Sequence, residues 1–188
     1  EGLSSKDRYY KLNIRLEKYL EICDAWIKDR GNYTDRYGNI SYGVYAQDQC
    51  SHEDMTEALG HAVRANLWYS SIAALGNYTK NESYVKSAKR IWDNIVGTQM
   101  YVTGGTGASE SLGEAYAGSY VLPQDGYCET CASVGMAFYA DNMFSLFGSS
   151  EYADVLELEL YNGILGSLSL DGDAFYYCNP LVSENYVR

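Results

Sequence analysis

The chain has 188 residues, of which 46% are hydrophobic and 21% charged, and its formal net charge is −11 at pH 7. These values are typical of one folded domain and exclude a disordered tail, and the acidic charge argues against nucleic acid as a partner, because phosphates require Lys and Arg. No stretch approaches the roughly 18 apolar residues of a membrane helix, so no membrane span is expected.

The first predicted helix covers residues 6–30. Its apolar residues recur at spacings of three and four, as on one face of a helix. They are Leu12, Leu16, Tyr19, Leu20, Cys23, Trp26 and Ile27. Ser4 with Asp7 is a candidate capping box, and Gly31 is a candidate C-terminal stop. The Tyr-, Asn- and Gly-rich residues 32–50 are expected to form a loop.

Two more helices are predicted before residue 97. One begins after Ser51, with Asp54 as its capping partner, and runs to about Leu75. Small residues surround His61 in this stretch, so this histidine is either a core residue or a polar group that points into a pocket. The next helix, at 82–96, carries one apolar stripe. The stripe consists of Val85, Ala88, Ile91, Trp92 and Ile95.

The last third of the chain is predicted to form two helices and a hairpin. Residues 129–147 are apolar on nearly every side, which is typical of a helix that is buried all round, as in the inner ring of a helical barrel. The helix at 150–165 is amphipathic and includes Glu157. A β-hairpin over 165–178 is expected around the turn dipeptide Asp171-Gly172. The expected fold class is therefore all-α, a toroid of successive helices.

Chemically active side chains gather between Gly113 and Val134. The preceding glycine-rich residues, from 97 onward, have no regular periodicity, and a long irregular segment in a helical domain favours a functional site. Glu114 can act as an acid/base group. Cys128-x-x-Cys131 allows a zinc half-site, a redox pair or a disulfide. Glu129 with Cys131 is an alternative metal half-site, in which the helix N-terminus favours the thiolate.

The N-glycosylation sequons and the cysteines bear on whether the protein is secreted into an oxidising compartment. The sequons begin at Asn32, Asn39, Asn77 and Asn81. All four fall in segments expected to be polar connectors, which favours a secreted, extracellular glycoprotein, with chance in Asn- and Ser-rich loops as the alternative. The five cysteines are an odd number. Cys23 and Cys50 are able to pair in an oxidising compartment, but the sequence leaves this pairing open.

Six short motifs follow one another along the chain. They are GHAVRA (60–65), YVTGGTG (101–107), GEAY (113–116), YCETCAS (127–133), LYNGILGSLSLDG (160–172) and FYYCNPL (175–181). In order and spacing they resemble the β-L-arabinofuranosidase family of glycoside hydrolases, family 127. The similarity extends over nearly the whole chain.

The resemblance implies an (α/α)6 barrel of six helical hairpins with accessory β-domains. Residues 1–188 would be the central segment of its catalytic domain, a partial barrel with a terminal β-hairpin. The implied activity is the removal of terminal β-L-arabinofuranosyl residues with retention of configuration. The implied nucleophile is a cysteine thiolate held on a zinc ion, which forms a thioglycosyl intermediate.

The resemblance also implies residue roles. Glu114 of GEAY matches the general acid/base, which protonates the leaving oxygen and then activates water. Glu129 and Cys131 match two zinc ligands, and zinc stabilises thiolates near neutral pH. The residues that match the lining of the sugar pocket are His61, Glu157 and Tyr177.

One departure from the family pattern concerns the nucleophile. The family takes its nucleophile and a further zinc ligand from a vicinal Cys-Cys downstream of the NPL motif, and this chain contains no Cys-Cys before its last residue, Arg188. The chain is therefore expected to be part of a longer protein and to be inactive alone.

A second function class fits the same sequence. A non-catalytic secreted glycoprotein would use the barrel for carbohydrate binding or for extracellular assembly, for instance as a homo-oligomer, and 20 tyrosines suit a sugar-binding surface. The retained Glu114, Glu129 and Cys131 favour the enzyme, whose partner is an arabinofuranoside substrate.

Overall fold

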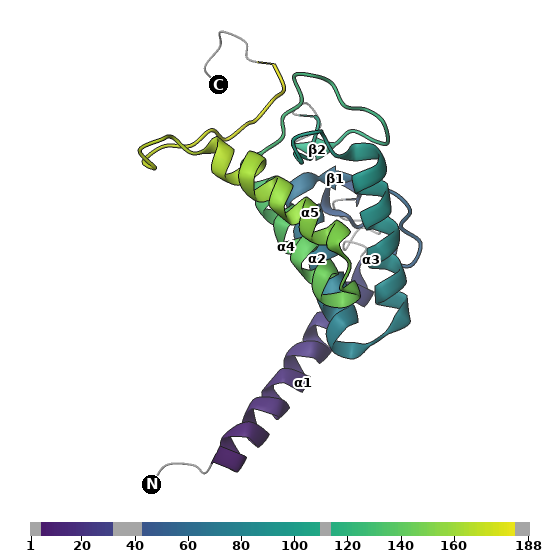
Figure 1. Ribbon diagram of the computed structural model, residues 1–188. Coiled ribbons are helices and arrows are strands. Elements are labelled where there is room, and N and C mark those ends of the chain that lie inside the picture. Colours follow the sequence, from purple (N-terminus) through teal and green to yellow (C-terminus); the bar gives the residue numbers. More distant parts are fainter. Residues whose placement is uncertain (1–4, 32–42, 110–113, 183–188) are drawn as a thin grey trace.

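The computed structural model describes residues 5–31, 43–109 and 114–182 (Figure 1). Five α-helices dominate the described residues: α1 (Ser5–Asp29), α2 (Ala62–Thr79), α3 (Glu82–Asn94), α4 (Thr130–Phe147) and α5 (Ser150–Leu158). Two short strands, β1 (Gly60–His61) and β2 (Ala115–Tyr116), pair antiparallel. Wider π-helical turns extend α3 and α5, at Ile95–Gln99 and Glu159–Ile164, and 3-10 turns cover Gly43–Ala46 and Leu165–Ser167.

The helices α2 to α5 form two helical hairpins with tight connections. After α2, Lys80 adopts a left-handed conformation and donates its N–H to the Gly76 carbonyl, and the Asn81 side chain then accepts the N–H of Ser83 to begin α3. After α4, Gly148 takes the same left-handed role and is followed by α5. Two-residue connections of this kind oblige consecutive helices to run antiparallel.

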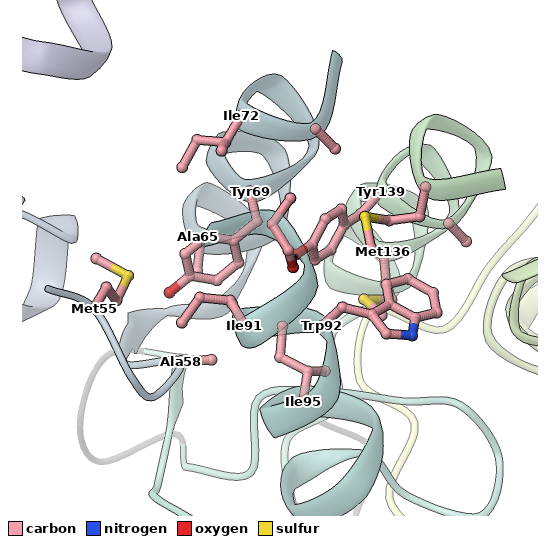
Figure 2. Packing of buried hydrophobic residues seen from close by; sticks show 14 of the residues in the cluster. Met55, Ala58, Ala65, Tyr69, Ile72, Ile91, Trp92, Ile95, Met136 and Tyr139 are labelled. Atoms are coloured by element: carbon pink, nitrogen blue, oxygen red, sulfur yellow. Dashed lines mark hydrogen bonds between the residues drawn. The ribbon is translucent and has the colours of Figure 1, made fainter. Parts of the chain in front are cut away.

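The core lies where the two hairpins meet. Helix α2 packs along α4, while α3 lies against α2 and α5 lies against α4 (Figure 1). Figure 2 shows Tyr69, Ile91, Trp92, Met136 and Tyr139 at this junction, and all of them are buried. The rings of Trp92 and Tyr139 meet edge-on at 5.3 Å, and the Tyr139 hydroxyl donates to the Ala88 carbonyl at 2.5 Å. The stripe predicted for α3 is confirmed at Ala88, Ile91 and Trp92, and Ile95 is buried in the π-helical turn that follows. Val85 is only partly buried, and Tyr84 is buried on this helix instead.

The helix predicted from Ser51 is wrong in its first ten residues. Ser51 and Asp54 form a hydrogen-bonded turn, but no helix follows. The backbone N–H and carbonyl of Ala58 are hydrogen-bonded to side chains instead of to other turns of a helix. The Asn94 side chain accepts the Ala58 N–H, and the Gln99 side chain donates to the Ala58 carbonyl. The helix begins only at Ala62, so His61 caps α2 instead of lying inside it.

Helix α4 is not buried all round within the described residues. Phe138, Phe144 and Phe147 are exposed, with Phe138 at 55%, because no described element covers that face. Helix α1 is confirmed in length and ends before Gly31, whose φ is +80°. Its N-terminal part extends away from the other helices (Figure 1), and Trp26 is 72% exposed. The capping box at Ser4 and Asp7 lies outside the described residues and side chains.

The C-terminal hairpin is present but shorter than predicted. Leu168 pairs with Phe175, the Tyr176 N–H donates to the Ser167 carbonyl, and Gly172 turns the chain with φ of +71°. The 3-10 turn at Leu165–Ser167 replaces the first residues of the expected strand. No helix in the described parts of the chain is long and apolar enough to cross a membrane.

Candidate active site

The β1–β2 pair brings His61 beside Glu114. His61 is the register partner of Ala115, and the Ala62 N–H donates to the Glu114 carbonyl at 3.0 Å. The side chains then meet, with His61 Nε2 at 3.2 Å from Glu114 Oε2. Because His61 Nδ1 accepts the N–H of Arg64, the neutral ring carries its proton on Nε2 and donates it to Glu114.

The second oxygen of Glu114 has a different partner. The Tyr127 hydroxyl donates to Glu114 Oε1 at 3.1 Å, so both carboxyl oxygens accept a hydrogen bond from a fixed side chain. The backbone of Glu114 is left-handed, with φ of +63°, which costs a non-glycine residue about 1 kcal/mol. Cys128 also has positive φ, at +41°. Non-glycine residues with positive φ cluster at functional sites, but they also end helices, as Lys80 does after α2.

Glu129 lies immediately before α4, and its carboxyl group lies near the side chains of His61 and Glu114. Its side chain is 4% exposed, and its Oε2 atom is buried without a hydrogen-bond partner among the described residues. The C-terminal segment holds this position, since Glu129 pairs with Cys178 and the Thr130 N–H donates to the Tyr177 carbonyl. Ligand atoms of His61, Glu114 and Glu129 all lie within 4.8 Å of one another.

Cys131 and Tyr177 adjoin Glu129. Burial raises the pKa of the Cys131 thiol, and its hydrogen bond with Glu129 and the charge of that carboxylate raise it further. The Tyr177 phenol has its pKa raised mainly by a hydrogen bond with Glu129, although the side chain is 46% exposed. The structure thus brings five of the predicted site residues together in one group, with Glu129 among the other four. They are His61, Glu114, Glu129, Cys131 and Tyr177.

These residues are able to hold a metal ion. Carboxylate, imidazole and thiol groups are metal ligands, and Glu129 both belongs to the converging group with His61 and Glu114 and has one buried oxygen, Oε2, without a partner among the described residues. The His61 nitrogen on this side carries a proton, however, and Glu114 already accepts two hydrogen bonds. Glu129, whose buried Oε2 has no partner among the described residues, is therefore the member of this group with a ligand atom to spare, and Cys131 lies beside it.

Cys128 has a different environment. It is buried in a small cluster with Tyr101 and Ala108, and burial, together with the nearby Glu159 and Cys178, raises the pKa of its thiol to about 12. None of the five cysteines forms a disulfide in the structure, so neither the Cys128–Cys131 nor the Cys23–Cys50 disulfide is present. The raised pKa of Cys128 opposes the thiolate form that a metal ligand requires, and the pKa of Cys131 is raised too, so the structure does not show the thiolate that the helix N-terminus was expected to favour.

The structure does not place Glu157 in this group, and a neighbouring acid is buried instead. Glu157 lies on α5 with its side chain exposed, whereas Glu159 is fully buried, with both oxygens unpartnered. A Cβ atom on Gly163 would lie 2.9 Å from Glu159 Oε2, and one on Gly104 would lie 3.2 Å from its Cδ. Burial raises the pKa of Glu159 well above its ordinary value, and the nearby Ser133 hydroxyl offsets part of this rise.

The Glu159→Gln variant is expected to lose a pH dependence of stability. An unfolded glutamate ionises near pH 4.5, while the folded state keeps the Glu159 proton to higher pH, so folding takes up a proton between the two pKa values. The free energy of unfolding therefore falls with rising pH in that window, by about 1.4 kcal/mol per pH unit. Denaturant unfolding from about pH 5 to about pH 8 should show a shallower slope for the variant. Glu157→Gln, on the exposed face, should retain the wild-type slope, and equal slopes in all three proteins would contradict the prediction.

The sequons are only partly visible. Asn32 and Asn39 lie outside the described residues. Asn81 is an exposed helix cap, as a connector position requires, but Asn77 lies in the last turn of α2 and not in a connector. Its side chain accepts a hydrogen bond from Lys80.

Sequence reasoning missed Tyr127 and the β1–β2 pair. Strands of two residues leave no periodic signal, and Tyr127 was visible only as the first residue of the YCETCAS motif. Spacing along the chain does not show that its hydroxyl meets Glu114, because 12 residues separate the two and the connection is irregular.

Comparison with known proteins agrees with this geometry. A family model described as "Beta-L-arabinofuranosidase, GH127 catalytic domain" matches residues 12–188. A non-reducing end β-L-arabinofuranosidase from Bifidobacterium longum subsp. longum is 45% identical over 129 residues, which make up 68% of this chain and 20% of that protein.

Solved structures share the fold. The GH127 β-L-arabinofuranosidase Ara127N-Se from Geobacillus stearothermophilus T6 has a TM-score of 0.82 at 34% identity, over 90% of this chain and 29% of that one. The GH127 β-arabinofuranosidase BT3674 has a TM-score of 0.83 at 41% identity, over 90% of this chain and 26% of that one. The all-α class is thus confirmed, and the two helical hairpins form part of an α/α barrel. The chain spans less than a third of the length of these relatives.

Proposed function

Because the chain belongs to the β-L-arabinofuranosidase family of glycoside hydrolases, GH127, we propose that it supplies the acid/base half of an active site that removes terminal β-L-arabinofuranosyl residues with retention of configuration. The observation that carries this proposal is the position of Glu114. Two donors fix its carboxyl group within reach of a second carboxylate, Glu129, and of the Cys131 thiol beside it.

Glu114 would act twice in a retaining reaction. In the first step its carboxylic acid protonates the oxygen that leaves the sugar, while a nucleophile from the remainder of the protein attacks the anomeric carbon. In the second step the Glu114 carboxylate takes a proton from water, which displaces the nucleophile and releases arabinose. The hydrogen bonds from His61 and Tyr127 stabilise the ionised form between the steps.

Glu129 and Cys131 would hold a zinc ion. One hard and one soft ligand suit this metal, and the buried Glu129 Oε2 without a partner supports the assignment. When bound, zinc would keep a cysteine nucleophile from another part of the protein in its thiolate form. His61 and Tyr177 would contact the sugar, with Tyr177 also orienting Glu129 by its hydrogen bond.

The test is an assay of the complete protein that contains this chain. We expect it to release arabinose from β-L-arabinofuranosides, and proton NMR of the first product formed in methanol should show a methyl β-L-arabinofuranoside, the retained anomer. The complete protein should contain a Cys-Cys pair. An inverted product would overturn the retaining mechanism, and a purified, folded protein without arabinofuranosidase activity would overturn the proposed function. We propose secretion as well, on the strength of the sequons alone.

A further inference from the structure

Tyr127 is held in place by several segments that meet beside Glu114. Its N–H donates to the Ala108 carbonyl at 3.3 Å, and its carbonyl accepts the N–H of Asn179 at 3.2 Å. Its ring contacts the Tyr177 ring edge-on, with centroids 6.4 Å apart, and the residue is only 8% exposed. A buried tyrosine with both backbone groups bonded has little freedom, so its hydroxyl is a fixed point in the site.

The Tyr127 hydroxyl and His61 each donate a hydrogen bond to a different oxygen of the Glu114 carboxyl group. Tyr127 donates to Oε1 and His61 Nε2 donates to Oε2, at 3.1 and 3.2 Å. A carboxylate offers about four lone-pair positions, so two remain for a proton and for substrate or water. Two donors on different oxygens fix the plane of the group, whereas one donor leaves it free to rotate.

Tyr127 is also chemically suited to remain a donor. An ordinary phenol ionises only near pH 10, so at neutral pH the hydroxyl has a proton to donate, and its oxygen lies 3.1 Å from Glu114 Oε1. The phenol contributes its one hydrogen to Glu114. Its contribution is therefore orientation, without a proton of its own to exchange.

We propose that Tyr127 is a positioning residue for the acid/base carboxyl of Glu114, and that it fixes the direction in which that group delivers its proton to the leaving oxygen. The inference rests on the proposed function. It follows that Tyr127 matters most where the leaving oxygen needs a proton, and least where the leaving group departs as a stable anion.

The test compares two substrates in the complete protein. In Tyr127→Phe, kcat/KM for a methyl or disaccharide arabinofuranoside should fall about 10- to 100-fold, the effect expected for a misplaced catalytic group. The kcat/KM value for the 4-nitrophenyl arabinofuranoside, whose leaving group needs little protonation, should fall by less than about threefold. The kcat/KM value reports the steps up to cleavage of the glycosidic bond. The difference between the losses on the two substrates therefore isolates proton donation to the leaving oxygen.

Tyr101→Phe is the matched control. Tyr101 is another buried tyrosine of the same loop region, and its hydroxyl donates to the Pro123 carbonyl at 2.9 Å and not to Glu114. This variant should lose similar stability but show no difference between the two substrates. Equal losses on both substrates in Tyr127→Phe would mean a structural role only, and unchanged kinetics would also overturn the proposal.

A measurement without substrate separates this inference from the proposed function. In crystals of Tyr127→Phe, Glu114 should occupy more than one side-chain conformation, while in the wild type and in Tyr101→Phe it should occupy one. A wild type that cleaves neither substrate would reject the arabinofuranosidase activity. The conformations of Glu114 would then still show whether Tyr127 fixes its carboxyl, and a single, unchanged conformation in the variant would reject that.

Discussion

Replacing Glu114 with glutamine in the complete protein is expected to lower kcat for an unactivated arabinofuranoside by about 10²- to 10⁴-fold. Glutamine has the shape of the acid but has no proton to give to the leaving oxygen. The effect on a 4-nitrophenyl substrate should be smaller in the first step and should be concentrated in the second, where the carboxylate activates water. Steady-state and burst kinetics on both substrates would measure the two effects separately.

The fold should tolerate this replacement. The glutamine oxygen accepts from His61 Nε2, and the glutamine amide donates to the Tyr127 hydroxyl, so neither neighbour is left unpaired. Thermal unfolding should therefore change little. An external nucleophile such as azide should partly restore turnover of the 4-nitrophenyl substrate. Wild-type activity in Glu114→Gln would remove Glu114 from the acid/base role.

The second large effect is expected in metal content. Cys131→Ser should lower the affinity for zinc by more than about 100-fold, because even residues that only support a metal ligand are worth 10- to 100-fold. Zinc measured by elemental analysis after dialysis against a weak chelator should fall from near one ion per protein to a small fraction. Glu129→Gln should act in the same direction, since its buried Oε2 would be replaced or turned away.

The chain contains its own controls for this experiment. Cys128→Ala removes a buried thiol three residues away, and Cys23→Ser removes an exposed one, so both should retain zinc. Loss of zinc in Cys128→Ala but not in Cys131→Ser would reverse the assignment and make Cys128 the ligand. Full zinc content in Cys131→Ser and Glu129→Gln together would remove the site from this part of the chain.

The helical part of the fold was predictable from the sequence because its signals are local. The stripe of α3, the glycine after α4 and the turn at Gly172 each act within a few residues. The error at Ser51 has a nonlocal cause: a capping pair normally starts a helix, but Asn94 and Gln99 bind the backbone of Ala58 first. No local pattern at 51–61 contains that information.

The candidate site was predictable in part for the same reason. Glu129 and Cys131 are close in sequence, and the GEAY and GHAVRA motifs identified Glu114 and His61. Only the β1–β2 register shows that His61 and Glu114 touch. The choice between the acids of α5 and its π-helical extension depends on helix rotation, and the structure buries Glu159 while exposing Glu157.

The left-handed backbone of Glu114 also limits how this protein can be engineered or can drift. Glycine at this position would relieve about 1 kcal/mol of strain, but it would also leave the buried Tyr127 hydroxyl without its acceptor, at a cost of about 1 to 3 kcal/mol. The hydrogen bonds to the carboxyl group therefore offset the strain of the backbone that carries it. Selection for stability alone would thus give no advantage to the loss of the proposed proton donor. A homologous sequence that carries glycine in place of Glu114 would have lost that donor and the acceptor for Tyr127 together.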